Sequence, residues 1–364
     1  MNTFGTKLRL TTFGESHGVA IGGVLDGLPA GIKIDLDYIQ GELDKRKPGG
    51  KFATSRKESD TLQILSGTFE GLSTGTPIGL LIENENQKSK DYDNVKDIFR
   101  PGHADFTYEK KFGIRDYRGG GRSSARESAV RVAGGALAQL FLNEFGVSVE
   151  SGIYSIGSVN HGANLDDEVS NLDFKFAESS EIYSLYPSLE DEFKEEILKA
   201  KKSHDSIGGS VVTIIKNAPV GLGEVLYDKF DARIAAAMMG INAVKGVEIG
   251  SGINASLNLG SRNNDEISTQ GFASNNAGGV LGGITTGQDI VIKTHFKPTP
   301  SIFIQQKTID KFGKDALCEL KGRHDPCVAV RGSVVATAMA RLVVADMMLL
   351  NLGSNLANIK RVYS

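Results

Sequence analysis

Arginines crowd a glycine-rich segment in the first half of the chain. The segment, residues 119–127, reads Gly-Gly-Gly-Arg-Ser-Ser-Ala-Arg-Glu. The arginines on it and beside it are Arg115, Arg118, Arg122, Arg126 and Arg131. Glycine-rich backbone that leads into a helix offers N–H groups and the positive end of a helix dipole to an anion. Because arginine also pairs bidentately with phosphate and carboxylate, we expect an anion-binding site here. The alternative is a solvated basic face.

Two histidines occupy short turns. His17 lies in Gly-Glu-Ser-His-Gly, residues 14–18, and His103 lies in Arg-Pro-Gly-His-Ala-Asp, residues 100–105. A turn leaves the imidazole open to a ligand, where it can act as a general acid or base; the alternative is a turn histidine without a role. Residues 14–18 also match the nucleophile elbow of serine hydrolases. That motif requires a helix after the serine, whereas residues 19–25 have a strand-like pattern, so a hydrolase is disfavoured.

Three further segments suit a polyanionic ligand. Residues 45–57 surround a Pro-Gly-Gly turn with lysines and arginines, residues 297–301 read Lys-Pro-Thr-Pro-Ser, and residues 323–327 read Arg-His-Asp-Pro-Cys. Asp325 precedes a proline, which favours an extended loop conformation. Together these groups predict an enzyme that performs acid/base chemistry on a small phosphorylated and carboxylated substrate. The histidines and cysteines lack metal-binding spacing, so we expect no metal.

Hydrophobic periodicity predicts the elements that position these loops. We expect strands at residues 7–13, 18–28, 76–83, 210–216 and 289–295, and helices at residues 36–47, 124–145, 231–240 and 333–352. Ser124 followed by Glu127 has the spacing of a capping box at a helix start. Residues 162–203 are the most charged stretch and predict an excursion or helical insert.

One short pattern recurs. Residues 146–153 and 246–253 share Gly-Val and, four residues later, Ser-Gly-Ile, in each case after an expected helix. This recurrence predicts a duplicated helix–strand unit. No segment is rich enough in Pro, Gly or Ser to mark a linker, so we expect residues 1–364 to form a single domain.

Composition narrows the class of protein. The chain has 364 residues, a formal net charge of −3 and two cysteines, Cys318 and Cys327. Slight acidity disfavours a nucleic-acid-binding protein, and two cysteines fit a reducing compartment without disulfides. The N-terminus does not resemble a signal peptide, and we identify no long apolar run typical of a membrane span. We therefore expect a cytoplasmic enzyme without nucleic-acid or membrane partners.

The motifs, in their order along the chain, resemble those of the chorismate synthase family. The matching segments are residues 14–18, 100–105, 121–128, 297–299 and 323–327. The resemblance implies a large single-domain α+β fold in which antiparallel or mixed sheets sandwich helices, with internal duplication, and a homotetramer. It also implies an anti 1,4-elimination of phosphate from 5-enolpyruvylshikimate 3-phosphate, giving chorismate. The family requires reduced FMN although no net redox change occurs.

The resemblance also implies roles for individual residues. His17 would donate a proton to the leaving phosphate, His103 would contact the reduced flavin and help to hold it as an anion, and Asp325 with Ser16 would relay a proton at flavin N5. The residues implied to bind the substrate are Arg46, Lys51, Arg100, Arg126 and Arg323. The residues implied to bind FMN are Arg122, Ser123, Ser124, Asn242, Ala243, Gly282, Lys297, Thr299, Ser301 and Arg323.

The sequence departs from the family's usual pattern at a few positions. Ser128 replaces Thr, and Pro300 replaces a Ser that would add a hydrogen bond to FMN. Val334 and Thr337 replace Pro and Glu near the start of the last long helix. Because no dinucleotide-binding fingerprint is recognisable, we expect the flavin to be reduced by an external reductant.

Overall fold

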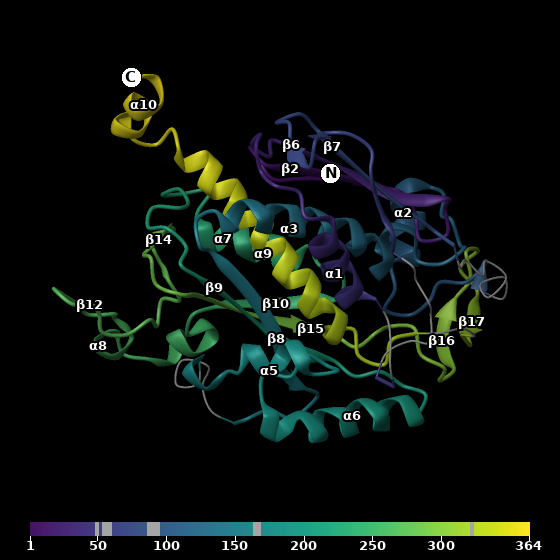
Figure 1. Ribbon diagram of the computed structural model, residues 1–364. Coiled ribbons are helices and arrows are strands. Elements are labelled where there is room, and N and C mark those ends of the chain that lie inside the picture. Colours follow the sequence, from purple (N-terminus) through teal and green to yellow (C-terminus); the bar gives the residue numbers. More distant parts are fainter. Residues whose placement is uncertain (48–50, 53–59, 86–94, 163–168, 321–323) are drawn as a thin grey trace.

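The computed structural model describes residues 1–47, 51–52, 60–85, 95–162, 169–320 and 324–364. Within these residues, two larger antiparallel sheets enclose a layer of helices (Figure 1). The strands of the first sheet lie in the order β1-β2-β3-β7-β4. They are β1 Thr3–Phe4, β2 Arg9–Phe13, β3 Ala20–Asp26, β4 Leu62–Ile64 and β7 Ile78–Glu83. The expected α+β fold is confirmed.

The second sheet has the strand order β10-β15-β9-β8. Its strands are β8 Ser148–Ile156, β9 Gly209–Lys216, β10 Val244–Ile249 and β15 Ile290–Phe296. The side chains of β9 are almost all buried, because helices cover one face of this sheet and the charged segment near β8 covers the other (Figure 1). This explains the continuous run Val-Val-Thr-Ile-Ile in place of an alternating pattern.

The two sheets repeat one order of elements, strand–strand–helix–strand–strand–helix. Helix α1 (Leu36–Arg46) separates β3 from β4, and α7 (Phe230–Met239) separates β9 from β10. Helix α3 (Ser128–Asn143) follows β7, and α9 (Ala329–Asn351) follows β15. The recurrence at residues 146 and 246 does not mark this relation, because β8 and β10 are opposite edges of one sheet. Each copy of the pattern does follow a helix, α3 before β8 and α7 before β10, and the duplicated helix–strand unit stays a prediction.

Small residues bring the central layers close together. A Cβ atom on Gly135 of α3 would lie 2.5 Å from the Cα atom of Ala338 in α9, and one on Gly23 of β3 would lie 2.6 Å from Val130 of α3. Neither position has room for a larger residue. The long helices therefore cross at short range between the sheets, and their apolar faces form the core.

Helix α9 begins at Ala329, four residues before its predicted start. Val334 and Thr337 consequently lie inside the helix, where Thr337 Oγ1 donates a hydrogen bond to Ser151 Oγ at 2.8 Å. The helix is long and apolar enough to cross a membrane, but most of it is buried inside the protein. Its hydropathy is that of a core helix.

The predicted capping box at Ser124 is not formed. Ser124 Oγ accepts a hydrogen bond from Arg126 N, at 3.3 Å, within a short 3-10 turn at Ala125–Glu127. The Glu127 carboxylate instead accepts from Arg131 Nε at 3.0 Å. Helix α3 then begins at Ser128. The predicted helix was correct, and its cap was wrong.

Shorter elements surround this framework. The charged stretch of residues 162–203 contains two α-helices among its described residues, α5 (Phe174–Ser179) and α6 (Glu190–Lys202), joined by a segment in which Ser184 forms a bridge with Ile153, and both helices pack along β8. The other helices are α2 Asp105–Phe112, α8 Gly260–Asn263 and α10 Leu356–Tyr363. The small hairpins are β5 Thr68–Phe69 with β6 Leu72–Ser73, β11 Ile267–Ser268 with β12 Gly271–Phe272, β13 Val280–Leu281 with β14 Ile284–Thr285, and β16 Gln306–Ile309 with β17 Asp315–Cys318.

A buried aspartate near the end of α9 holds the start of the chain. Asp346 accepts hydrogen bonds from the backbone N–H groups of Thr6, Lys7 and Leu8, at 2.9, 2.7 and 2.8 Å. Arg233 of α7 lies 3.5 Å from the same carboxylate. We call Asp346 and these three backbone N–H groups the Asp346 clamp.

Candidate active site

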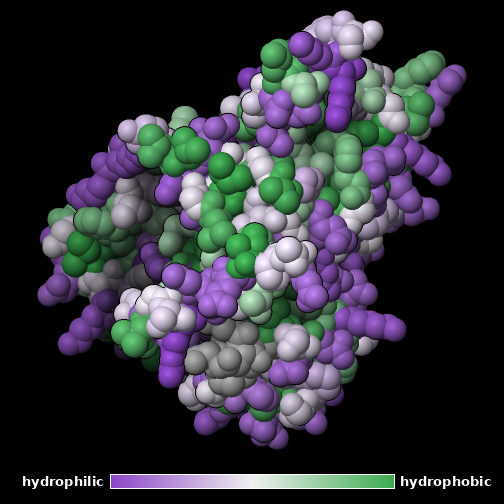
Figure 2. Space-filling model, turned by 90° about the vertical axis from the view of Figure 1, so that its left-hand side faces the viewer, coloured by the Kyte–Doolittle hydropathy of each residue, from purple (hydrophilic) through white to green (hydrophobic). Residues whose placement is uncertain are grey.

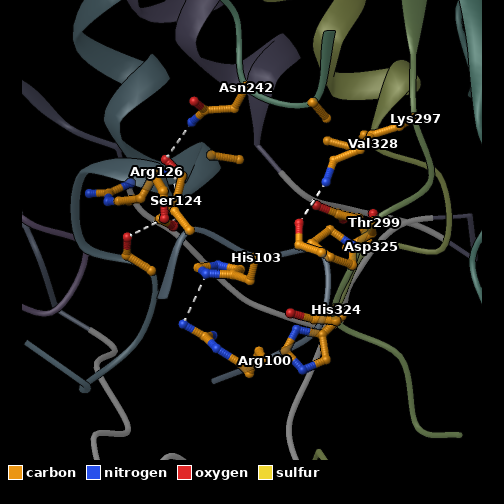
Figure 3. A pocket seen from close by; sticks show the side chains of 18 of the residues that line it. Arg100, His103, Ser124, Arg126, Asn242, Lys297, Thr299, His324, Asp325 and Val328 are labelled. Carbon is orange, nitrogen blue, oxygen red and sulfur yellow. Dashed lines mark hydrogen bonds between the residues drawn. The ribbon is translucent and has the colours of Figure 1, made fainter. Parts of the chain in front are cut away.

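A cavity of about 390 Å³ opens where loops from both halves of the chain meet (Figure 3). Its size falls within the range of small-molecule sites. Eleven of the residues expected to be functional line it, and His103 lies near its centre in the view (Figure 3). These eleven residues are Arg100, His103, Ser123, Ser124, Arg126, Asn242, Ala243, Lys297, Thr299, Ser301 and Asp325.

Hydrogen bonds between the loops hold the cavity walls together. Lys297 Nζ donates to the carbonyl of Gly102 at 2.6 Å, and Lys297 N donates to the carbonyl of Ala243 at 2.9 Å. Asn242 Nδ2 donates to the carbonyl of Ser124 at 3.1 Å. The segments that carry the sequence motifs are thus connected directly to one another. Burial lowers the pKa of Lys297, although its side chain is only partly enclosed.

Arg100 and His103 share one carboxylate at the cavity wall. Arg100 Nε and Nη2 donate to the two oxygens of Asp105, each at 2.7 Å, and His103 Nδ1 lies 3.0 Å from Oδ1. Arg115 Nη1 lies 2.9 Å from Oδ2 of the same residue. Burial acts to raise the pKa of Asp105, but hydrogen bonds from Arg100 and His103 outweigh burial and hold that pKa well below its usual range. Asp105 is therefore ionised.

Burial lowers the pKa of His103 below its ordinary value, although the hydrogen bond with Asp105 opposes the change. The imidazole is consequently neutral at neutral pH. An ionised carboxylate can only accept hydrogen bonds, so the Asp105 contact favours a ring proton on Nδ1. Arg100 Nη2 also lies 3.2 Å from Nδ1, but it donates to Asp105 and to the Gly119 carbonyl at shorter distances. With the proton on Nδ1, the lone pair lies on Nε2, as in histidines oriented by a carboxylate.

The opposite wall carries Asp325 and Thr299. Asp325 is paired with Arg331 Nη1 at 2.9 Å, and Arg331 Nε donates to the carbonyl of Arg46 at 3.1 Å. Thr299 Oγ1 is buried and has no hydrogen-bond partner among the described residues. A buried hydroxyl without a partner is costly, so this atom is suited to contact a polar ligand group.

Ser16 and His17 lie beside the cavity and do not line it. Both side chains are buried, and Ser16 Oγ lies 3.0 Å from His17 Nδ1. A Cβ atom on Gly119 would lie 2.3 Å from His17 Nδ1, so the glycine permits this close contact. Arg100 Nη2 donates to the Gly119 carbonyl at 2.9 Å. Strand β3 follows the turn, and the absence of a helix after Ser16 agrees with the rejection of a hydrolase.

Four other expected residues do not line the cavity either. Arg122 donates to Thr12 Oγ1 at 2.5 Å and thus points toward β2, although its segment borders a neighbouring pocket. Gly282 lies in the β13–β14 turn. Lys51 is exposed, with its carbonyl accepting a hydrogen bond from Lys201 Nζ at 2.8 Å. Arg46 is fully buried. Arg323 lies outside the described residues.

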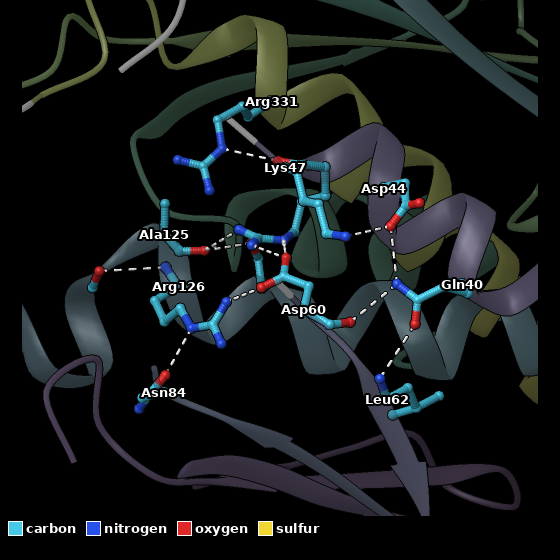
Figure 4. Close-up of polar contacts among 12 residues, drawn as sticks. Gln40, Asp44, Lys47, Asp60, Leu62, Asn84, Ala125, Arg126 and Arg331 are labelled. Atoms are coloured by element: carbon cyan, nitrogen blue, oxygen red, sulfur yellow. Dashed lines mark hydrogen bonds and ion pairs between the residues drawn. The ribbon is translucent and has the colours of Figure 1, made fainter. Parts of the chain in front are cut away.

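Sequence reasoning missed three residues that shape this region. Asp60 forms ion pairs with Arg46 and Arg126 (Figure 4), Asp105 binds Arg100 and His103, and Arg331 binds Asp325. Asp105 belongs to the motif at residues 100–105, and Arg331 follows Asp325 by six residues, so proximity in sequence could have indicated both. Asp60 gave no such signal. Within the described ranges, no group of three or more His, Cys, Asp or Glu side chains is placed to hold a metal ion.

Comparison with known proteins identifies the family. The family model for chorismate synthase matches residues 8–349. The chorismate synthase of Campylobacter hominis is 67% identical over 365 residues, and that of Campylobacter fetus subsp. fetus is 63% identical over 364 residues; each alignment covers 100% of both chains. A crystal structure of chorismate synthase matches with a TM-score of 0.76 and 32% identity, over 99% of this chain and 97% of that one. The chain belongs to the chorismate synthase family of lyases, which act in the shikimate pathway and in the biosynthesis of aromatic amino acids.

Proposed function

We propose that the cavity catalyses the anti 1,4-elimination of phosphate from 5-enolpyruvylshikimate 3-phosphate, with reduced FMN bound beside the substrate. The observation that carries this proposal is the convergence of Arg100, Arg126 and Lys297 on one cavity with His103 and Asp325. The substrate has a phosphate and two carboxylates, so cationic walls both bind it and stabilise the phosphate as it leaves.

The lining residues fit a flavin mononucleotide. Ser123, Ser124 and Ser301 place hydroxyl-bearing residues around the cavity, and Thr299 Oγ1 is buried without a described partner. Such groups suit the polar edge and phosphate of FMN. When bound, reduced FMN supplies an electron-rich ring that stabilises positive charge developing on the substrate. Pro300 also lines the cavity, and it provides neither the hydroxyl nor the N–H of a serine at this position.

The chain's own groups manage charge and protons. Arg100 is oriented by Asp105, so its guanidinium presents a fixed cation to the cavity. His103 is neutral, and a bound anion beside it would favour the charged imidazolium and raise its pKa. Asp325 is held by Arg331 on the opposite wall, where we assign it the proton relay with Ser16. We assign to His17 the protonation of the leaving phosphate.

We also propose a homotetramer. Exposed hydrophobic side chains gather on the face that carries α8, β12 and α10 (Figure 2). Leu257, Leu259 and Ile267 are 81%, 73% and 71% exposed, and apolar surface of this kind commonly marks contacts between subunits. We further propose that the enzyme acts in the cytoplasm and receives reduced flavin from an external reductant.

An anaerobic assay tests the reaction. The protein is mixed with 5-enolpyruvylshikimate 3-phosphate and chemically reduced FMN, and chorismate and phosphate are followed together. We expect equal release of both products, and none without reduced flavin. Tight FMN binding without turnover would contradict the lyase assignment. Replacement of the chemical reductant by NADPH tests whether the enzyme needs an external reductant. Turnover with oxidised FMN and NADPH alone would overturn the proposal that it does.

The same assay tests His17. We expect His17→Ala to lower kcat by about 10²-fold, the usual contribution of a general acid, while the Kd for FMN changes little because we assign His17 to the substrate phosphate and not to the flavin. Asp325→Ala is the partner variant, and it should also slow turnover. Wild-type kcat in His17→Ala would remove the residue from proton transfer.

A further inference from the structure

A buried carboxylate joins two of the arginines that the family resemblance implicates in substrate binding. Asp60 Oδ2 accepts hydrogen bonds from Nε of Arg46, at 3.2 Å, and from its Nη2, and Oδ1 accepts from Nη1 of Arg126 (Figure 4). The side chains of Asp60 and Arg46 are 0% exposed. We call these three residues the Asp60 cluster. One carboxylate thus binds two guanidinium groups that come from α1 and from the turn before α3.

The backbone holds the Asp60 carboxylate in place. Gln40 Nε2 donates to the carbonyl of Asp60 at 3.2 Å, and Gln40 Oε1 accepts from Leu62 N at 3.3 Å (Figure 4). Asp60 has a φ of 47°, a left-handed conformation that non-glycine residues rarely adopt. Since Gln40 of α1 binds the main chain at Asp60 and at Leu62, the carboxylate is held close to the helix.

Arg126 is the member of the Asp60 cluster that reaches the cavity. Its side chain lines the cavity, whereas Arg46 does not. Its Nε donates to Asn84 Oδ1 at 2.8 Å and its Nη2 donates to the carbonyl of Glu83 at 3.0 Å. Asp60 adds a charged acceptor to these two neutral ones. Because charge-assisted hydrogen bonds are the stronger ones, the direction of the Arg126 guanidinium depends chiefly on Asp60.

We propose that Asp60 is a positioning residue for the lyase reaction. It fixes the direction in which Arg126 presents its guanidinium to an anionic group of the substrate. It also balances the charge of buried Arg46, which leaves the Asp60 cluster with one net positive charge next to the cavity. This inference rests on the proposed function, because it requires the substrate anion to meet Arg126.

Asp60→Asn tests the proposal directly. Asparagine keeps the volume but replaces one acceptor oxygen by an NH₂ group. Arg126 also donates to Asn84 and to the Glu83 carbonyl, whereas the Arg46 side chain is 0% exposed, so the remaining oxygen should stay with Arg46 and the NH₂ group should face Arg126. Two donors then oppose each other. We expect the KM for 5-enolpyruvylshikimate 3-phosphate to rise at least about tenfold and kcat to stay within about threefold, the pattern of a lost binding interaction.

A double-mutant cycle tests whether Asp60 acts through Arg126. In an Arg126→Ala background, Asp60→Asn should raise KM by less than about twofold, because the group it orients is gone. An equal rise in both backgrounds would overturn the proposal. A KM at or below the wild-type value in Asp60→Asn would also overturn the proposal. In that case the positive charge gained by removing the carboxylate would strengthen substrate binding at least as much as the lost orientation of Arg126 weakens it.

Two residues on α1 give matched controls. Asp44→Asn makes the same change of charge at a side chain that is 55% exposed and pairs with Lys47. Glu42→Gln breaks a buried ion pair between Glu42 of α1 and Arg341 of α9. Neither side chain pairs with a side chain of the Asp60 cluster. Asp44 Oδ1 does accept from Gln40 Nε2 at 2.9 Å, and the amide oxygen of asparagine can accept the same hydrogen bond. We expect the KM of both variants to stay within about twofold of the wild type, even if Glu42→Gln lowers the melting temperature.

Gln40→Leu provides a second variant if Asp60→Asn does not fold. It removes the two hydrogen bonds that hold residues 60 and 62 but keeps the carboxylate. We expect a smaller rise in KM in the same direction, and an unchanged KM would contradict the proposal. Wild-type turnover is measured alongside: its absence would disprove the proposed function, whereas normal turnover with unaffected variants would disprove only the role of Asp60.

Discussion

Asp60 and Asp346 are both buried aspartates, 0% and 2% exposed, yet their partners differ in kind. Asp346 accepts hydrogen bonds from three backbone N–H groups of one segment. Asp60 accepts from the side chains of Arg46 and Arg126. Backbone amides are fixed parts of the fold, whereas a guanidinium next to a cavity can also meet a ligand.

Because of this difference, we expect the two aspartates to have different roles, one in stability alone and the other also in substrate binding. Loss of the Asp346 clamp should cost stability and spare binding. Loss of Asp60 should change binding as well as stability, because Arg126 meets the cavity and buried Arg46 loses its charged partner. The partners of a buried carboxylate, rather than its burial, therefore indicate whether it serves the fold alone or also the site. Three substitutions and one titration test this comparison.

The largest effect is expected for Asp346→Ala. The substitution removes the acceptor of one buried and two part-buried backbone N–H groups, and a buried N–H group without a partner costs about 1–3 kcal/mol. We expect the free energy of unfolding to fall by about 3 kcal/mol, measured by urea denaturation, with KM unchanged below the transition. Asp346→Asn keeps one acceptor oxygen and should lose less. A loss below about 1 kcal/mol, or a raised KM in the folded variant, would contradict the comparison.

Arg126→Ala should show the reverse pattern. It removes a cation from the cavity wall, so we expect KM for the substrate to rise by about 10²-fold, or about 2.7 kcal/mol of transition-state stabilisation if kcat is unchanged. The free energy of unfolding should fall less than in Asp346→Ala. Steady-state kinetics and urea denaturation of the same preparation measure both quantities. An unchanged KM would show that Arg126 does not meet the substrate.

The cavity contains a largely buried histidine, His103, whose titration makes stability depend on pH. Burial lowers the pKa of His103 in the folded protein, whereas in the unfolded chain it is about 6.5. Since the unfolded chain then binds a proton that the folded protein does not, this residue reduces stability as pH falls from about 6.5 toward its folded pKa. NMR titration of the imidazole, assigned with His103→Gln, should give a pKa below 6.5. A value above 6.5 would contradict a buried neutral imidazole.

The smallest effect is expected for Arg233→Gln. Arg233 lies 3.5 Å from the Asp346 carboxylate, but its side chain is 28% exposed and therefore screened by solvent. We expect a loss below about 1 kcal/mol in urea denaturation and no change in KM. A loss as large as that of Asp346→Ala would mean that the side-chain ion pair, and not the backbone N–H groups, maintains the clamp.

Much of the framework could be predicted from local sequence. Periodicity located β2, β3, β7, β9 and β15 and the helices of the central layer, because each buries one or both faces. It could not place the start of α9, since residues 329–332 are buried on all sides and show no amphipathic pattern. The capping box failed because Glu127 finds a stronger partner in Arg131 than in the backbone.

The cavity was predictable as motifs but not as a set of contacts. His103 and Thr299 belong to loops whose composition alone suggested a ligand, and the structure places both at the cavity. The orientation of Arg46 was not predictable, because its partner Asp60 follows on a separate segment and is recognisable only after the chain folds. A basic run in a sequence usually indicates a solvated surface. Arg46 is instead buried, because it pairs with the Asp60 carboxylate.

Helix α9 connects the cavity to the Asp346 clamp without a break. Arg331, which pairs with Asp325 at the cavity, and Asp346 are fifteen residues apart, or about 22 Å at the rise of an α-helix. In hydrogen-exchange experiments, such a buried helix opens with the core as one cooperative unit. Within α9, the amide protons near Arg331 should therefore exchange as slowly as the amide protons near Asp346. Loss of the Asp346 clamp should speed exchange at Leu8, whose N–H group it binds, without speeding exchange at the cavity end of α9.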